Sequence, residues 1–177
     1  MMMDDNFFWF KRNGIHIPGV KGEHLFMHIT DTHVSTWDEG SSPEERAETE
    51  KQEAMWASFK EKFARGQLPF SVGNDEPYGD PQRISTVEAF EKQLALAEEL
   101  KPEALLLSGD NLERIHEAGA RYLKRKLAAY SGKFLCVPGN HEPESMDGVY
   151  EPGVRTLDFD GFRIVAGGDG LVGDQAA

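Results

Sequence analysis

The chain contains three short apolar segments, and each of them ends in a cluster of polar residues typical of a ligand site. The clearest is residues 134–137 (FLCV), which the turn sequence PGNHE follows at once. Residues 25–29 (LFMHI) run into TDTH, and residues 105–107 (LLL) run into SGDNLE. Short apolar runs with little alternation are typical of buried parallel strands covered on both faces. The pattern therefore predicts three central strands whose polar ends carry the function.

Amphipathic segments between these strands predict helices and hence an α/β fold. A capping box of Ser42 and Glu45 opens a helix that should end near Gly66. Its inward stripe is predicted to be Met55, Phe59 and Phe63. A second helix over 85–101 should bury Val87, Phe90, Leu94 and Ala97. A third should bury Ile115, Ala118, Tyr122 and Leu127. Asp160-Gly161 predicts a hairpin of strands 154–159 and 162–165.

The length and charge of the chain limit its class. A chain of 177 residues suits one domain, with a core at 24–166, an N-terminal extension at 1–23 and a frayed tail at 167–177. Its net charge of −12 disfavours binding to long nucleic acid or to an anionic membrane. The single cysteine, Cys136, excludes an intrachain disulfide and favours a reducing compartment. We therefore expect a cytoplasmic protein that does not enter the membrane.

The polar strand ends are predicted to converge. The alternation of strands and helices implies parallel pairing, which places the carboxyl ends of the strands at one edge of the sheet. Asp31, His33, Asp110, Asn140 and His141 would then meet although they are distant in sequence. Carboxylate, imidazole and amide ligands suit divalent ions such as Mn²⁺, Fe²⁺ or Zn²⁺. A carboxylate can also bridge two such ions, which together clamp a phosphoryl group.

Three motifs in this order carry a family resemblance. D-x-H at 31–33, G-D-x-x-E at 109–113 and G-N-H-E at 139–142 each follow an apolar strand and resemble the calcineurin-like metallophosphoesterases. The resemblance covers 25–142 and extends to the hairpin at 165. It implies an α/β/β/α-type sandwich and a metal-dependent phosphoric ester hydrolase, a phosphatase or a phosphodiesterase. The substrate would be a nucleotide or another small phosphorylated molecule, and the cofactors two divalent ions of manganese, iron or zinc.

The resemblance also implies roles for individual residues. Asp31 and His33 would hold the first metal, Asp110 would bridge, and Asn140 would bind the second. A metal-bound hydroxide would attack phosphorus, and His141 would protonate the leaving oxygen or stabilise the developing charge. Three neighbours would orient the ligands without binding metal themselves. They are Asn111, Glu113 and Glu142.

The sequence departs from the family pattern after the third motif. The family supplies three later histidines, but no histidine follows His141 here. The second metal would keep only Asp110 and Asn140, and the sandwich would be incomplete on its C-terminal side. Three explanations stay open: a fragment of a longer phosphoesterase, a compact variant with other ligands, or a degenerate member that serves as a non-catalytic binding or regulatory module. Other ligands could come from Glu142, Asp158, Asp169, Asp174, His16 or a second subunit, so a homo-oligomer is one expectation.

Overall fold

The computed structural model describes residues 13–64, 85–114, 116–142, 149, 154–160 and 162–167. The elements are β1 (Phe26–Ile29), α1 (Pro43–Ala64), α2 (Thr86–Leu100), β2 (Ala104–Ser108), α3 (Glu117–Ala129), β3 (Phe134–Val137), β4 (Val154–Phe159) and β5 (Phe162–Gly167). This order of strands and helices confirms the predicted α/β class.

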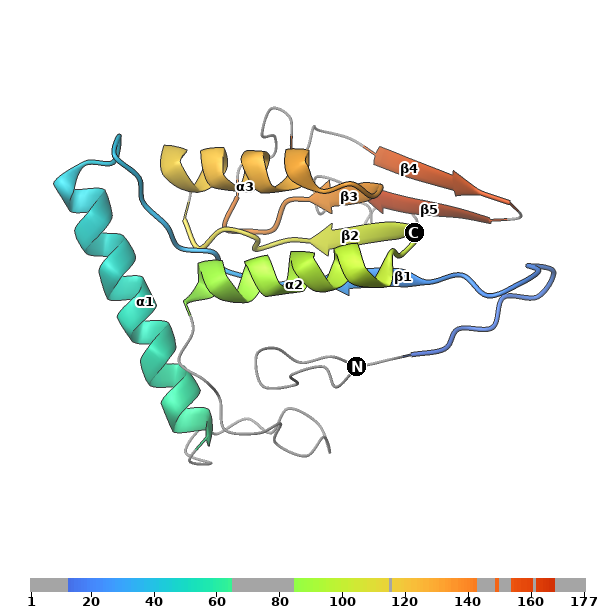
Figure 1. The fold of residues 1–177 in the computed structure, drawn as a ribbon, viewed down its shortest axis with the longest axis horizontal. Coiled ribbons are helices and arrows are strands. Elements are labelled where there is room, and N and C mark those ends of the chain that lie inside the picture. The colour runs from blue at the N-terminus through green and yellow to red at the C-terminus, as the bar shows by residue number, and fades with distance from the viewer. Residues whose placement is uncertain are drawn as a thin grey trace, which may run out of the picture.

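The central sheet consists of the three strands that precede the motifs. They pair in parallel in the order β1-β2-β3, and Ile29, Leu107 and Cys136 stand in register across the sheet. All three strands point toward the side on which α1 lies (Figure 1). The segments that follow them therefore leave the sheet at one edge, as the parallel arrangement requires.

Helices α2 and α3 cover one face of this sheet. Leu105 and Leu107 of β2 are at most 1% exposed and belong to the same core cluster as Phe90 of α2 and Leu123 of α3. The rings of Phe90 and Tyr122 lie 6.4 Å apart, which shows that the two helices are neighbours. The predicted inward stripe of α2 is confirmed, because Phe90, Leu94 and Ala97 are buried and Val87 packs against the core. Ala118, Tyr122 and Leu127, which were predicted to face inward, are likewise buried on α3, whereas Ile115 lies outside the described residues.

The hairpin of β4 and β5 contacts the opposite face through aromatic rings. Side chains alternate along a strand, so Phe26 points away from the buried Met27. Its ring meets Phe159 edge-on at 5.2 Å, and Phe159 stacks on Phe162 at 5.0 Å. The predicted hairpin is confirmed, and β5 continues two residues beyond the predicted end, to Gly167. These two strands form a second, antiparallel sheet.

Helix α1 begins as predicted but packs differently. The capping box is present, since Glu45 N donates to Ser42 Oγ at 3.1 Å and Ser42 N donates to Glu45 Oε2 at 2.8 Å. The inward position predicted for Met55 is wrong, because this side chain is 39% exposed while Thr49 and Gln52 are buried. The side chains of Phe59 and Phe63, the loop after Gly66 and the tail beyond 167 lie outside the described residues. No helix in the described ranges is both long and apolar enough to cross a membrane.

Candidate metal centre

The segments after β1 and β2 stay paired beyond the ends of the strands. Asp31 N donates to Gly109 O at 3.1 Å, and His33 N donates to Asp110 O at 2.8 Å. One step further, Val34 and Leu112 form an isolated parallel bridge. The backbone of the first motif is thus hydrogen-bonded along its length to that of the second, which fixes the relative positions of their Cα atoms.

Two glycines bring the second and third motifs into direct contact. A Cβ on Gly109, whose φ is +79°, would lie 3.0 Å from the Cα of Gly139. A Cβ on Gly139 would lie 2.2 Å from Asp110 Oδ1, closer than any real contact. This approach lets His141 N donate to Asp110 Oδ1 at 3.1 Å. Space therefore requires a glycine at both positions, and the positive φ of Gly109 favours glycine there by conformation as well.

Three of the predicted metal ligands have a left-handed backbone. The φ angles of Asp31, His33 and Asp110 are +54°, +45° and +49°. A residue other than glycine in this region costs of order 1–3 kcal/mol, and such strain concentrates at functional sites. Among the described residues the other non-glycine position of this kind is Lys101, the C-cap of α2. Three of the four described non-glycine residues with a left-handed backbone are thus predicted metal ligands.

The same three side chains point to a common place. Asp31, His33 and Asp110 can each offer one ligand atom, and these atoms all lie within 4.8 Å of one another. Two carboxylates and an imidazole fit a divalent ion such as Mn²⁺, Fe²⁺ or Zn²⁺. The predicted convergence of these residues is seen, and the donor set fits the metal that the motifs imply. Asn140 occupies the exposed turn position just before His141.

Glu113 contacts both histidines of the site. Its Oε2 lies 2.9 Å from His33 Nδ1, close enough for an ion pair although the two atoms are not aligned as a hydrogen bond. Its backbone carbonyl oxygen lies 2.8 Å from His141 Nδ1. Because a carbonyl oxygen only accepts, His141 Nδ1 must carry a proton. Its Nε2 then has a lone pair in the neutral ring and a second proton in the cation. The two rings meet edge to face, with centroids 5.0 Å apart.

The protonated form of His141 is favoured by its surroundings. The hydrogen bond to the Glu113 carbonyl raises the pKa of this imidazole above its ordinary value, and the carboxylates of Asp110, Glu113 and Glu142 act in the same direction. Partial burial opposes this shift. The residue is thus placed to hold a proton on Nε2.

A second ligand set shares His33. His33, Glu113 and His141 can also offer three atoms within 4.8 Å of one another. The Nδ1 atoms of both histidines face Glu113, however, which is the arrangement of a carboxylate or carbonyl that orients an imidazole for work at its other nitrogen. The contacts therefore favour orientation of the two rings by Glu113.

Glu142 and Asn111 lie buried beside the motifs. The Glu142 carboxylate accepts from Leu112 N and from Gly139 N, both at 2.7 Å, and so joins the second motif to the third. Asn111 is fully buried, and its amide donates to Val137 O at 3.5 Å. Both residues support the motif backbones.

In the described part of the chain, each of the other residues proposed as ligands of a second ion bonds to another group or lies on another segment. Glu142 is committed to its two backbone donors, and Asp158 pairs with Arg163 on the hairpin. His16 is exposed in the segment before β1. Asp169 and Asp174 lie outside the described residues. Within the described ranges, Asp110 and Asn140 remain the predicted pair for the second ion.

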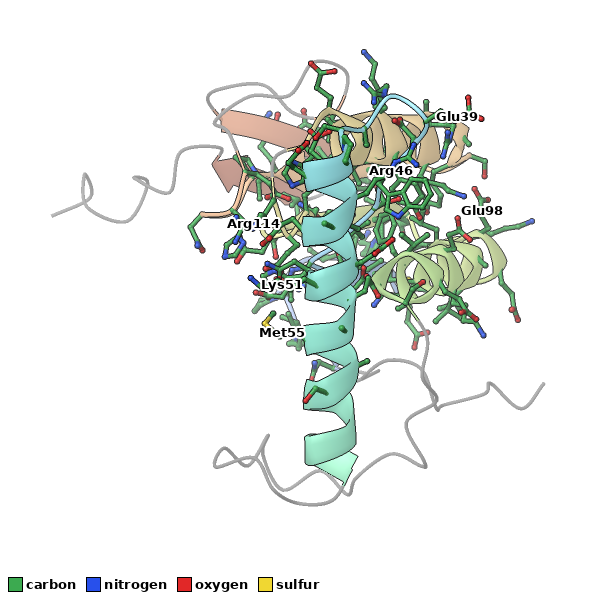
Figure 2. The ribbon with its side chains drawn as sticks, turned by 90° about the vertical axis from the view of Figure 1, so that its left-hand side faces the viewer. Glu39, Arg46, Lys51, Met55, Glu98 and Arg114 are labelled. Atoms are coloured by element: carbon green, nitrogen blue, oxygen red, sulfur yellow. The ribbon has the colours of Figure 1, made fainter. Side chains whose placement is uncertain are left out.

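Helix α1 is tied to the site by an ion pair that the motifs do not predict. Arg114 directly follows Glu113, and its Nη2 lies 3.2 Å from Glu48 Oε1 of α1. Figure 2 shows Arg114 on the same side of α1 as Lys51 and Met55. The role of the Glu113 carbonyl could not be predicted either, because a backbone contact leaves no mark in the side-chain pattern.

No curated protein matches the chain, but one family model does. The family model described as calcineurin-like phosphoesterase matches residues 24–173, which include all three motifs, the central sheet and the hairpin. With the match extending over most of the sequence and the candidate ligand residues gathered at one sheet edge, the chain belongs to the calcineurin-like phosphoesterase family.

Proposed function

We propose that this chain hydrolyses the phosphate mono- or diester of a small molecule, such as a nucleotide, at the loops that follow β1, β2 and β3. The observation that supports this most is the meeting of Asp31, His33 and Asp110, each in a left-handed conformation, within 4.8 Å. These three residues would hold one divalent cation. Asp110 and Asn140 would contribute to a second.

The cations would supply charge stabilisation of the phosphoryl oxygens and would lower the pKa of water. The protein supplies the position of the ligands and a proton donor. Glu113 holds His33 in place through its carboxylate and His141 through its carbonyl. His141 Nε2 would then donate its proton to the leaving oxygen of the ester. In the protein without metal, the hydrogen bond to the Glu113 carbonyl and the neighbouring carboxylates raise the pKa of this imidazole, which favours its protonated form.

The acidic character of the protein bears on the substrate. With a net charge of −12, the chain repels a long polyanion unless the bound cations reverse the charge locally. A small ester needs this reversal only at the site itself. We therefore propose a small phosphorylated substrate.

The test is hydrolysis of p-nitrophenyl phosphate and of bis(p-nitrophenyl) phosphate with added Mn²⁺, Fe²⁺ or Zn²⁺. We expect turnover of at least one ester, loss of turnover after chelation, and recovery when the metal is restored. Metal binding without turnover of any ester would favour the non-catalytic module. No metal binding and no turnover would contradict the proposed function.

His141→Ala tests the proton donor separately. General acid catalysis contributes about 10²–10⁴-fold, so the variant should lose activity on this scale while it still binds metal. The loss should be larger for an alkyl phosphate than for p-nitrophenyl phosphate, because nitrophenolate leaves without a proton. His16→Ala, at an exposed position before β1, is the control and should behave as the wild type. Equal losses on both esters would contradict the assignment of His141 as the acid.

A further inference from the structure

The loop that leaves the metal site after His33 is fastened to helix α2 at one point. Ser35 N donates to Thr86 Oγ1 at 2.9 Å, in a contact between residues 51 positions apart. Both residues are buried, with 9% and 7% of their surface exposed. Thr86 is the first residue of α2, so the start of this helix lies directly behind the loop.

The hydroxyl of Thr86 is oriented by a carboxylate from a third element. Glu53 of α1 accepts from Thr86 Oγ1, and its two oxygens each lie 3.3 Å from Thr86 N. A hydroxyl has one hydrogen, and an ionised carboxylate can only accept. The hydrogen of Thr86 therefore points to Glu53, and a lone pair is left to receive the N–H of Ser35. The relay Glu53–Thr86–Ser35 joins α1, α2 and the loop.

The loop needs support on this side. Asp31 and His33 are held in the left-handed region, and their backbone N–H groups are tied to the segment after β2. Val34 N continues this tie by donating to Asn111 O at 2.9 Å. The next residue along the chain, Ser35, bonds instead to Thr86 at the start of α2, so the loop is held by the helices as well as by the segment after β2. A backbone held from two sides keeps a conformation that it would leave if it were held from one.

We propose that Thr86 is a positioning residue of the metal site. Through the relay Glu53–Thr86–Ser35 it holds the loop so that Asp31 and His33 keep their left-handed conformation and their approach to Asp110. The inference rests on the proposed function, because it requires that these three residues bind a metal. It adds that α1 and α2, which carry none of the proposed ligands, influence the metal affinity of the site.

The experiment compares Thr86→Val, Thr86→Ser and Ser85→Ala with the wild type. Valine keeps the shape of the side chain but cannot accept from Ser35, whereas serine keeps the hydroxyl. Ser85→Ala is the matched control, because Ser85 Oγ caps the same helix by accepting from Glu88 N at 3.1 Å and is not a member of the relay. Mn²⁺ affinity is measured by titration, and stability is measured by urea unfolding without metal.

We expect Thr86→Val to weaken Mn²⁺ binding about tenfold, the lower end of the effect of residues that orient metal ligands. Thr86→Ser should restore most of the wild-type affinity. Ser85→Ala should lower the unfolding midpoint and leave the affinity unchanged. An equal affinity loss in Thr86→Val and Ser85→Ala, or wild-type affinity in Thr86→Val, would overturn the inference.

Glu53→Gln provides a second variant that perturbs the relay without removing the Thr86 hydroxyl. It should weaken Mn²⁺ binding in the same direction and by a smaller factor, and unchanged affinity would count against the relay. The Mn²⁺ affinity of the wild type distinguishes failure of the proposed metal site from failure of the relay. A wild type that binds no Mn²⁺ would refute the metal site and the relay together, whereas a wild type that binds and a Thr86→Val variant that binds equally well would refute the relay alone.

Discussion

Asp110→Asn is expected to reduce phosphoester hydrolysis about a thousandfold while the protein stays folded. The site places Asp110 against both Asp31 and His33, so loss of its charge weakens the hold on every cation that it contacts. A catalytic metal contributes several kcal/mol, and about 4 kcal/mol corresponds to a factor of a thousand in rate.

The structure makes asparagine a clean probe at this position. Asp110 has a φ of +49°, a conformation that asparagine tolerates well. The amide oxygen can still accept from His141 N, as Asp110 Oδ1 does at 3.1 Å. The unfolding midpoint without metal should therefore stay close to that of the wild type.

Asp158→Asn is the matched control for this substitution. Asp158 lies exposed on β4, where it pairs with Arg163, and exposed ion pairs contribute little to stability. Activity should be unchanged in this variant. If Asp110→Asn kept as much activity as Asp158→Asn, the site described here would not be the place of catalysis.

Glu142→Ala is expected to cause the largest loss of stability, about 3 kcal/mol. The carboxylate is 8% exposed and accepts from two backbone donors, Leu112 N and Gly139 N. Removing it leaves the buried N–H of Leu112 and the part-buried N–H of Gly139 without this acceptor, and a buried unsatisfied group costs about 1–3 kcal/mol. Because these donors belong to different motifs, the contact between the second and third motifs should loosen as well. Urea unfolding measures the effect.

Glu45→Ala serves as the comparison for Glu142→Ala. Glu45 also accepts from a backbone N–H, that of Ser42 at 2.8 Å, but at the half-buried start of α1. Loss of a capping interaction typically costs about 1 kcal/mol. If Glu142→Ala lowered the free energy of unfolding no more than Glu45→Ala does, the hydrogen bonds of Glu142 to the second and third motifs would contribute no more than an ordinary cap.

Much of the fold could be predicted because local signals agree with tertiary structure. The strand at 134–137 is observed with the predicted bounds, since its apolar run is broken by Pro138-Gly139. Helix α2 carries a clear apolar stripe and ends at Leu100, two residues before Pro102, so its place against the core follows from periodicity. The hairpin follows from Asp160-Gly161 in the same way.

Helix α1 shows where such reasoning fails. Its apolar residues Met55, Phe59 and Phe63 suggested a buried stripe, yet α1 buries Thr49 and Gln52 and leaves Met55 exposed. This helix packs near loops through polar residues, one of which, Glu53, bonds to Thr86. Apolar periodicity cannot orient a helix whose contacts are polar.

The convergence of Asp31, His33 and Asp110 could be predicted because parallel strands deliver their ends to one edge. The conformation of that edge could not. Nothing in the sequence shows that Asp31, His33 and Asp110 adopt positive φ angles, because the backbone bonds that hold them come from other segments. The bond between Ser35 and Thr86 joins two residues with no periodic or motif relation, so it appears only in three dimensions.

The position of Mn²⁺ in crystals grown with the ion tests the proposed metal centre most directly. We expect a peak of anomalous density coordinated by Asp31, His33 and Asp110, with any second peak sharing Asp110 and reaching Asn140. The distances to ligand oxygen and nitrogen atoms should be about 2.0–2.3 Å, typical of a first-row divalent ion. Density held by His33, Glu113 and His141 instead, or no density at this edge of the sheet, would contradict the proposed centre.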